Sequence, residues 1–155
     1  MPSRKVKEYL DQAGIKYEIM EHDTVYTAQE VAAVTHVSGE ELAKTVIINA
    51  DGKIMMAVMP STRKIDFELL KKNLGAKNIT LTKEQDFSPL FPDCEIGAMP
   101  PLGKLYKMEM IVDQSLAEDT QIVFNAGTHH DIIKISYADF EKLEQPKLAN
   151  ITGHI

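Results

Sequence analysis

Two strand-like segments joined by a tight turn constrain the fold of this chain more than any other feature. Residues 45–49 and 54–59 are rich in β-branched and apolar side chains, and Asp51-Gly52 stands between them. An Asp-Gly pair favours the two-residue turn of a β-hairpin, because both turn positions require a positive φ. The sequence therefore predicts a pair of adjacent antiparallel strands in this region.

Lys44 is an unexpected residue at the start of the first predicted strand, inside the apolar stretch 42–48. An ammonium group is rarely buried without a partner. Its side chain either extends along apolar surface to reach water or meets an anionic or carbonyl partner. From the sequence alone, a solvated lysine at a strand edge and a substrate contact both stay open.

The remaining periodicity predicts alternating helices and strands without a repeat or a linker. Val6, Tyr9, Leu10 and Ala13 have helical spacing, and Gly14 ends that helix. The further expected elements are a strand at 17–20, helices beginning at Thr27 and Ser38, a helix from Asp66 to Gly75, a short helix from Thr82 broken at Pro89, strands at 105–112, 121–125 and 132–135, and a helix at 137–143.

This order predicts an α/β fold of the α+β type. The helices are too irregularly spaced for repeated βαβ units, so we expect a single domain with a mixed, mostly antiparallel sheet flanked by helices. The domain is expected to cover residues 1–145. Residues 146–155 follow the last helix and begin with a proline, so we expect them to form a loosely ordered C-terminal tail.

Composition narrows the possible functions. The chain has 155 residues, 44% of them hydrophobic, which suits a folded domain with a core of its own. Its net charge of −6 argues against non-specific nucleic-acid binding, DNA included, because that binding needs lysine and arginine to neutralise phosphates. The charged N-terminus does not have the pattern of a signal peptide, and no apolar run approaches a membrane span. We therefore expect a cytoplasmic protein that makes no membrane contact.

Two loops have unusual chemistry. Residues 97–103 hold two glycines and two prolines, a combination that is rigid yet allows a ligand to approach the backbone closely. Such a loop can present N–H groups to a carbonyl or phosphate, or it can be simply a tight connection between strands. Residues 125–131 gather Asn, Gly, Thr and two His at the junction of two predicted strands, where they form a polar turn or line a pocket.

Metal, nucleotide and covalent chemistry find little support in the sequence. His129 and His130 are adjacent, so on a strand they would point to opposite faces, and neither His22 nor His36 completes a recognisable ligand spacing. The sequence contains neither a Gly-rich nucleotide fingerprint nor a Gly-x-Ser-x-Gly elbow. Cys94 lies between two acidic residues that would raise its thiol pKa. We therefore expect no metal and no cofactor.

Several short motifs follow one another in a definite order along the chain. They are His22 ahead of Thr27-Ala28-Gln29-Glu30, Ala43-Lys44-Thr45 at the start of a strand, Gly97 and Pro101 with Leu102-Gly103, Val112-Asp113 ahead of Ser115-Leu116, and Ala126-Gly127-Thr128-His129. Their order and spacing resemble the YbaK/EbsC family, which is related to the editing domain inserted in bacterial prolyl-tRNA synthetases. The resemblance covers nearly the whole predicted domain.

The resemblance implies a hydrolase that acts in trans on a mischarged aminoacyl-tRNA. The expected substrate is the ester of a small amino acid, such as alanine or cysteine, at the 3′ end of a tRNA, with tRNA-Pro the expected carrier. An aminoacyl-tRNA synthetase is an expected partner, because the chain itself has little basic character. The family mechanism relies on a positioned water molecule and not on a protein nucleophile.

The resemblance also implies which residues form the site. Catalytic positions are Lys44, Gly97, Pro101 and His129, and substrate-binding positions are His22, Thr45, Ala98, Met99, Gly127 and Thr128. Lys44 would contact the substrate near the terminal adenosine, and the loop from Gly97 to Pro101 would shape the amino-acid pocket. His129 matches the family histidine better than His130, because it stands two residues after Gly127.

Two alternatives are weighed against the deacylase. One is a non-enzymatic module of the same fold that binds tRNA, a nucleotide or a protein, which the acidic net charge leaves open. The other is a metal-dependent hydrolase that uses the histidines, which the ligand spacing disfavours.

Overall fold

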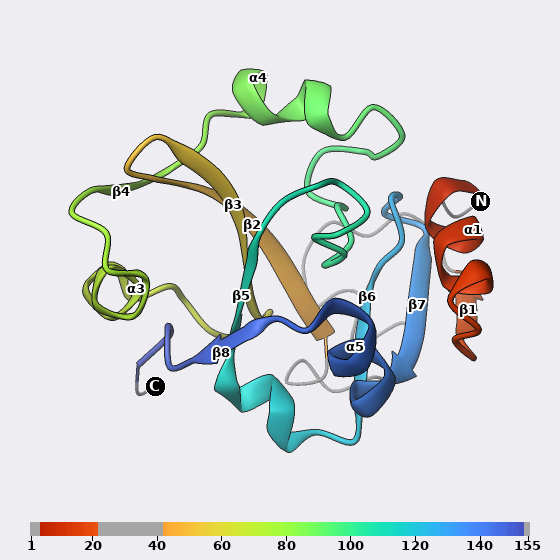
Figure 1. Ribbon diagram of the computed structural model, residues 1–155. Coiled ribbons are helices and arrows are strands. Elements are labelled where there is room, and N and C mark those ends of the chain that lie inside the picture. Colours follow the sequence, from red (N-terminus) through yellow and green to blue (C-terminus); the bar gives the residue numbers. More distant parts are fainter. Residues whose placement is uncertain (1–3, 22–41, 154–155) are drawn as a thin grey trace.

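The computed structural model describes residues 4–21 and 42–153 of the chain (Figure 1). The helices expected at Thr27 and Ser38, and the candidate residue His22, lie outside the described residues. Each helix within the described ranges falls short of the length and apolar character needed to cross a bilayer.

Eight strands form one mixed sheet within the described residues. They are β1 (Glu18–Glu21), β2 (Leu42–Ala50), β3 (Lys53–Pro60), β4 (Ile79–Leu81), β5 (Met110–Asp113), β6 (Gln121–Asn125), β7 (Asp131–Ser136) and β8 (Lys147–Ala149). The order across the sheet is β1-β7-β6-β2-β3-β5-β8, and β4 pairs with β2. The pairs β1–β7, β6–β7, β2–β3 and β2–β4 are antiparallel, whereas β2–β6, β3–β5 and β5–β8 are parallel. The expected mixed, mostly antiparallel sheet is confirmed.

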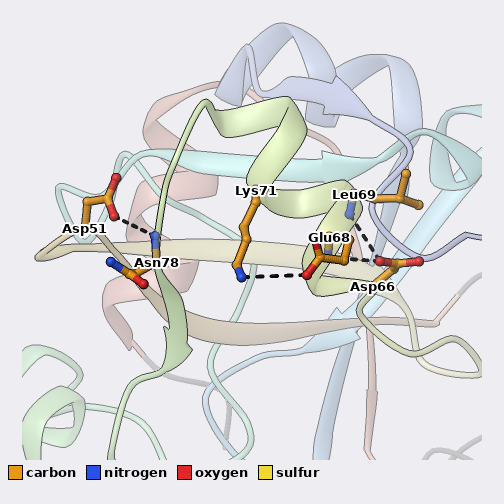
Figure 2. Close-up of polar contacts among 6 residues, drawn as sticks. All are labelled: Asp51, Asp66, Glu68, Leu69, Lys71 and Asn78. Carbon is orange, nitrogen blue, oxygen red and sulfur yellow. Dashed lines mark hydrogen bonds and ion pairs between the residues drawn. The ribbon is translucent and has the colours of Figure 1, made fainter.

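The central hairpin forms at the predicted turn. Asp51 and Gly52 have φ values of 51° and 92°, and the strands pair from Ala50 with Lys53 onward. Figure 2 shows how Asp51 also fastens the start of β4, because its carboxylate accepts the N–H of Asn78 at 2.8 Å. Hydrogen bonds from the N–H groups of Lys77 and Asn78 lower the pKa of this carboxyl group.

Four α-helices and two short 3-10 helices, η1 and η2, accompany the sheet in the described part of the chain. They are α1 (Arg4–Gln12), α3 (Phe67–Leu74), α4 (Glu84–Phe87), α5 (Tyr137–Glu144), η1 (Ser88–Leu90) and η2 (Gln114–Glu118). Helix α3 begins and ends as its sequence predicts. Asp66 accepts the N–H groups of Glu68 and Leu69, as Figure 2 shows, and Gly75 has the left-handed conformation that closes a helix.

The two faces of the sheet carry separate apolar cores, which Figure 1 shows covered by different helices. Helices α1 and α5 and the segment 87–108 cover one face, which we call the α1/α5 face; Leu10 and Phe140 are fully buried there. Helix α3 covers the other face, the α3 face, where Leu70 is fully buried. Burial of an apolar side chain of this size is worth about 1.5–3 kcal/mol, so both layers contribute to stability.

Three expectations about local structure are wrong. The strand predicted at 105–112 begins only at Met110, because residues 104–107 form turns whose N–H groups bond to carbonyls such as that of Gly103. Pro89 is not where the helix from Glu84 breaks, since α4 ends at Phe87 and Pro89 is the second residue of the 3-10 turn η1 that follows. The predicted N-cap Thr82 is also displaced, because Lys83 precedes that helix.

The predicted loose tail is also wrong for residues 147–153. Residues 147–149 form β8 beside β5, and Ile151 is fully buried in the core of the α3 face. The carboxylate of Asp113, only 1% exposed, accepts the N–H of Ile151 at 2.9 Å and the hydroxyl of Thr152 at 3.1 Å. The first bond satisfies a backbone N–H of the segment, which remains attached to the sheet although it follows Pro146.

Candidate active site

The glycine- and proline-rich loop packs directly against the turn between β6 and β7. The N–H of Gly127 donates to the carbonyl of Ala98 at 3.0 Å, and the N–H of Glu95 donates to the carbonyl of Gly127 at 2.7 Å. Within the loop, Ala98, Met99 and Pro101 are buried. Two segments that are 30 residues apart in the sequence therefore form one surface.

His129 is held in a defined orientation against this loop. Its N–H donates to Glu95 Oε1 at 2.6 Å, and its ring Nε2 lies 2.7 Å from the carbonyl oxygen of Ile96. A carbonyl only accepts, so Nε2 carries the proton and Nδ1 is the acceptor nitrogen of the neutral ring. His130 is exposed, and its N–H donates to Thr128 Oγ1. His129 is thus the histidine that contacts the loop.

Gly97 has a backbone conformation that favours glycine beside the imidazole. Its φ of +85° lies in the left-handed region, and a Cβ at this position would stand 3.4 Å from His129 Cε1, in van der Waals contact with the ring. A side chain there would strain the backbone.

The tip of the turn has its own hydrogen bonds. Thr128 Oγ1 donates to Asp131 Oδ2 at 2.6 Å and accepts the N–H of Asp131 at 3.1 Å. Asp131 is fully buried, so this pair fixes the turn from within. Gly127 and Thr128, both predicted to bind substrate, therefore also shape the turn that carries His129.

Lys44 lies on the α3 face, away from the core under the Gly97 loop. It pairs with Met59 across the β2–β3 hairpin, and Met59 belongs to the α3-face core. Its side chain borders a hollow of about 280 Å³ whose other lining residues are Val46, Met59, Lys64, Ile65, Phe67 and Leu81. Burial lowers the pKa of Lys44, and the neighbouring charge of Lys64 lowers it further.

The edge of β2 is open beside Lys44 in the described part of the chain. Strand β6 pairs with β2 only at Leu42 and Ala43, and β4 pairs only from Ile48 to Ala50. Residues 44–47 therefore have a strand neighbour on the β3 side alone. The gap between β6 and β4 along this edge of β2 lets groups on the two faces of the sheet approach one another.

Two polar side chains at this opening have buried oxygens without a hydrogen-bond partner among the described residues: Thr45 Oγ1 and Asn125 Oδ1. Thr45 pairs with Val58, so it points to the α1/α5 face, to which Met99 also belongs. Asn125 and Lys44 each stand two residues beyond the Leu42–Val123 pair, so they share the α3 face where the two strands separate. Buried oxygens that lack a partner are costly and mark positions suited to a ligand.

The structure thus arranges the predicted site residues in two groups. One group consists of residues that contact one another, with Met99 and Pro101 in the same loop: Gly97, Ala98, Gly127 and His129. Lys44 lies on the α3 face, whereas Thr45, the next residue of β2, points to the α1/α5 face. Sequence reasoning missed Glu95, and it named Asn125 only as part of the polar turn 125–131. Only the folded chain shows that Glu95 bonds to His129 and that Asn125 Oδ1 is buried without a partner among the described residues.

Covalent and metal chemistry have no evident place in the described residues. Burial raises the pKa of the Cys94 thiol to about 11, and the charge of Asp93 adds to the rise. The expected direction of this shift is confirmed, although burial and not the acidic neighbours is its main cause. Within residues 4–21 and 42–153, no group of three or more His, Cys, Asp or Glu side chains is placed to hold a metal ion.

Comparisons with known proteins identify the family of the chain. The family model of the aminoacyl-tRNA editing domain matches residues 22–143. The chain is 24% identical over 146 residues to the multifunctional Ser/Thr-tRNA deacylase ProXp-y of Escherichia coli, covering 91% of this chain and 87% of the relative. It is 25% identical over 140 residues to the prolyl-tRNA editing protein ProX of Acetoanaerobium sticklandii, covering 86% and 85%.

A solved structure shows the same fold. The crystal structure of a candidate trans-editing enzyme for prolyl tRNA synthetase superposes with a TM-score of 0.87 at 16% identity, covering 98% of this chain and 97% of the other. The match to the family model extends over most of the domain and includes Lys44, the Gly97 loop and His129. The chain therefore belongs to the aminoacyl-tRNA editing domain family, whose members hydrolyse mischarged aminoacyl-tRNA.

Proposed function

We propose that the chain is a trans-acting deacylase for tRNA mischarged with a small amino acid such as alanine or cysteine, with tRNA-Pro the expected carrier. The observation that carries this proposal is the interlocking of the Gly97 loop with the His129 turn beside the open edge of β2. It gives a wall of small residues on one side of β2, and the hollow with Lys44 and Lys64 lies on the other. A wall of small residues suits an ester whose amino acid has a small side chain better than one whose side chain is long.

The proposed reaction is attack of a water oxygen on the ester carbonyl carbon. The bond from that carbon to the ribose oxygen breaks, which leaves the free amino acid and a tRNA with its terminal hydroxyl restored. An aminoacyl ester is already activated, so orientation of the water and stabilisation of the oxyanion supply much of the required acceleration. The N–H groups of Gly97 and Met99 are the proposed donors of the loop, because that of Ala98 bonds to the carbonyl of Glu95 and the two prolines have none. The His129 ring is proposed to border the attacking water.

Lys44 is proposed to hold the tRNA end and not to act as base. Its hollow combines the ammonium groups of Lys44 and Lys64 with the apolar surfaces of Phe67 and Leu81. Ammonium groups attract a phosphate, and an aromatic face stacks on a base, here the terminal adenine. Because β2 is open at this point, the aminoacyl group would reach the Gly97 loop from there.

Editing of small amino acids has a physical rationale. A pocket distinguishes side chains that differ by one methylene by only about 1–3 kcal/mol, so synthetases misacylate and a second sieve is needed. The names of the two relatives refer to different substrates: one is called a Ser/Thr-tRNA deacylase and the other a prolyl-tRNA editing protein. Serine and threonine therefore belong in the panel of substrates, beside alanine and cysteine.

The test is amino-acid release from tRNAs charged in turn with alanine, cysteine, serine and threonine, on tRNA-Pro and on each amino acid's own tRNA. We expect release of alanine or cysteine from tRNA-Pro by the wild type and a loss of at least about tenfold in Lys44→Ala. Lys72→Ala, which removes an exposed lysine of α3, is the matched control. If no charged tRNA is hydrolysed, the enzymatic proposal fails and the binding-module alternative replaces it.

Cellular context follows from the same proposal. A protein that clears mischarged tRNA works beside the synthetases in the cytoplasm, and we propose that one of them supplies tRNA specificity. The net charge of −6 supports this division, since the chain has little charge with which to retain tRNA by itself.

A further inference from the structure

Glu95, two residues before Gly97, makes two of the four hydrogen bonds described between residues 95–98 and the His129 turn; the other two join Ala98 to Gly127 and Ile96 to His129. Its N–H donates to the carbonyl of Gly127 at 2.7 Å, and its carbonyl accepts the N–H of Ala98 at 3.1 Å. Its carboxylate Oε1 accepts the N–H of His129 at 2.6 Å. Glu95 therefore bonds both to the Gly97 loop and to the His129 turn.

The side-chain bond fixes a position that the backbone bonds leave adjustable. The backbone contacts of Glu95 hold Gly127 and Ala98, but the peptide of His129 lies two residues further along the turn. The carboxylate bond holds that peptide, and the carbonyl of Ile96 then receives the ring Nε2 at 2.7 Å. Backbone and ring of His129 are therefore both fastened to consecutive residues of the same loop.

The segment that carries Glu95 is itself anchored. The hydroxyl of Tyr106 donates to Asp93 at 3.1 Å and lies 3.2 Å from Cys94 Sγ, and its ring packs at 4.4 Å from that of Phe91. These contacts attach residues 91–94 to the core of the α1/α5 face. Glu95 therefore extends from a fixed base, so its carboxylate can determine where His129 lies.

We propose that Glu95 is a positioning residue of the deacylation site, acting by holding His129 against Gly97 and so setting the width of the amino-acid pocket. This inference rests on the proposed function. Without the carboxylate, the His129 peptide loses its hydrogen bond to Glu95, which weakens the attachment of the turn to the Gly97 loop and with it the hydrogen bond from Nε2 to Ile96. The rate of deacylation should then fall, and the site should distinguish less well between small and larger amino acids.

Two variants test the inference. Glu95→Ala removes the acceptor, whereas Glu95→Gln keeps an amide oxygen that accepts the same N–H. We expect kcat/KM for the best substrate to fall about tenfold in Glu95→Ala and to stay within about threefold of wild type in Glu95→Gln. The preference for the smaller amino acid should narrow in Glu95→Ala alone. Glu84→Ala, at an exposed glutamate of α4, is the matched control.

Nitrogen-15 NMR of the His129 imidazole gives a second measure that does not depend on activity. In the neutral ring, the wild type should show a protonated Nε2 and an unprotonated Nδ1, and Glu95→Ala should show averaged signals. His129→Gln assigns the resonances. Circular dichroism of each variant confirms that the fold persists.

The outcomes separate the two proposals. If the wild type hydrolyses no aminoacyl-tRNA, the proposed function fails, and the NMR signals still report whether Glu95 positions His129. If Glu95→Ala keeps wild-type selectivity and an unchanged His129 spectrum, the positioning role is overturned. Equal losses in Glu95→Ala and Glu95→Gln would also overturn it, because the amide would have restored the bond.

Discussion

Lys44 shows at the scale of one residue how a binding role opposes stability. Its ammonium group is half-buried in a mainly apolar hollow, and this burial lowers its pKa from the ordinary 10.5. A lowered pKa means that the folded protein binds this proton less tightly than the unfolded chain does. The resulting cost to stability is present in full below the folded-state pKa and disappears as pH rises through the ordinary value.

Lys44→Met should therefore stabilise the protein while it impairs deacylation. The free energy of unfolding at neutral pH should rise by less than about 1 kcal/mol, because solvent screens a half-exposed group. The gain should shrink as pH approaches the ordinary lysine pKa. Urea denaturation at several pH values measures this, with Lys72→Met as control. A destabilised Lys44→Met would contradict the assigned burial cost.

Gly97 is the residue where backbone conformation and site shape coincide. Gly97→Ala forces a side chain into the left-handed region, which costs about 1–2 kcal/mol, and places a methyl group in van der Waals contact with His129. Gly14→Ala is the matched control, since Gly14 has a φ of +71° but no described atom lies within 4 Å of its added Cβ. Both variants should lose similar stability by thermal denaturation, but only Gly97→Ala should lose deacylation. Equal activities would show that the contact with His129 is unimportant.

At the scale of elements, the C-terminal segment belongs to the sheet. Strand β8 pairs with β5, and the N–H of Asp66 donates to the carbonyl of Ile151 at 2.8 Å, which links the segment to the start of α3. Segments that are far apart in the sequence are thereby joined. The short, separate tail expected from the sequence would have had no such effect.

Ile151→Ala should accordingly destabilise the protein by about 2–4 kcal/mol, because it leaves a cavity in the core of the α3 face. Leu148→Ala, at a β8 side chain that is 37% exposed, should cost less than about 1 kcal/mol. Urea denaturation of the two variants makes the comparison. If Ile151→Ala behaves like Leu148→Ala, the segment does not contribute to the cooperative fold.

At the scale of the whole molecule, an acidic protein is proposed to bind a polyanion through a few local lysines. Only Lys44 and Lys64 line the proposed hollow among the described lysines. With about two phosphates neutralised, log Kd for an acceptor-stem minihelix should change by about 2 or less per decade of salt. Fluorescence anisotropy in increasing KCl tests this, and Lys64→Ala should reduce the slope by about 1. A slope above about 6 would instead indicate an extended phosphate interface.

The sequence by itself determined the local elements and the family. Asp51-Gly52 fixed the hairpin, Asp66 and Gly75 fixed the ends of α3, and the order of motifs identified an editing domain, because turns, caps and strand periodicity depend on neighbouring residues. It failed for residues 105–109 and for β8, where an apolar run or a proline suggested one structure and long-range packing produced another.

Only the tertiary structure decided which candidate residues meet. Gly97 and His129 are 32 positions apart, and their contact depends on hydrogen bonds that His129 donates to Glu95 and Ile96 and that no local pattern encodes. The same folding put Lys44 on the opposite face of β2, because successive side chains of a strand alternate and the β3 register is fixed by the hairpin. Local chemistry is written in the sequence, whereas the side of the sheet that each group occupies is set by pairing between distant strands.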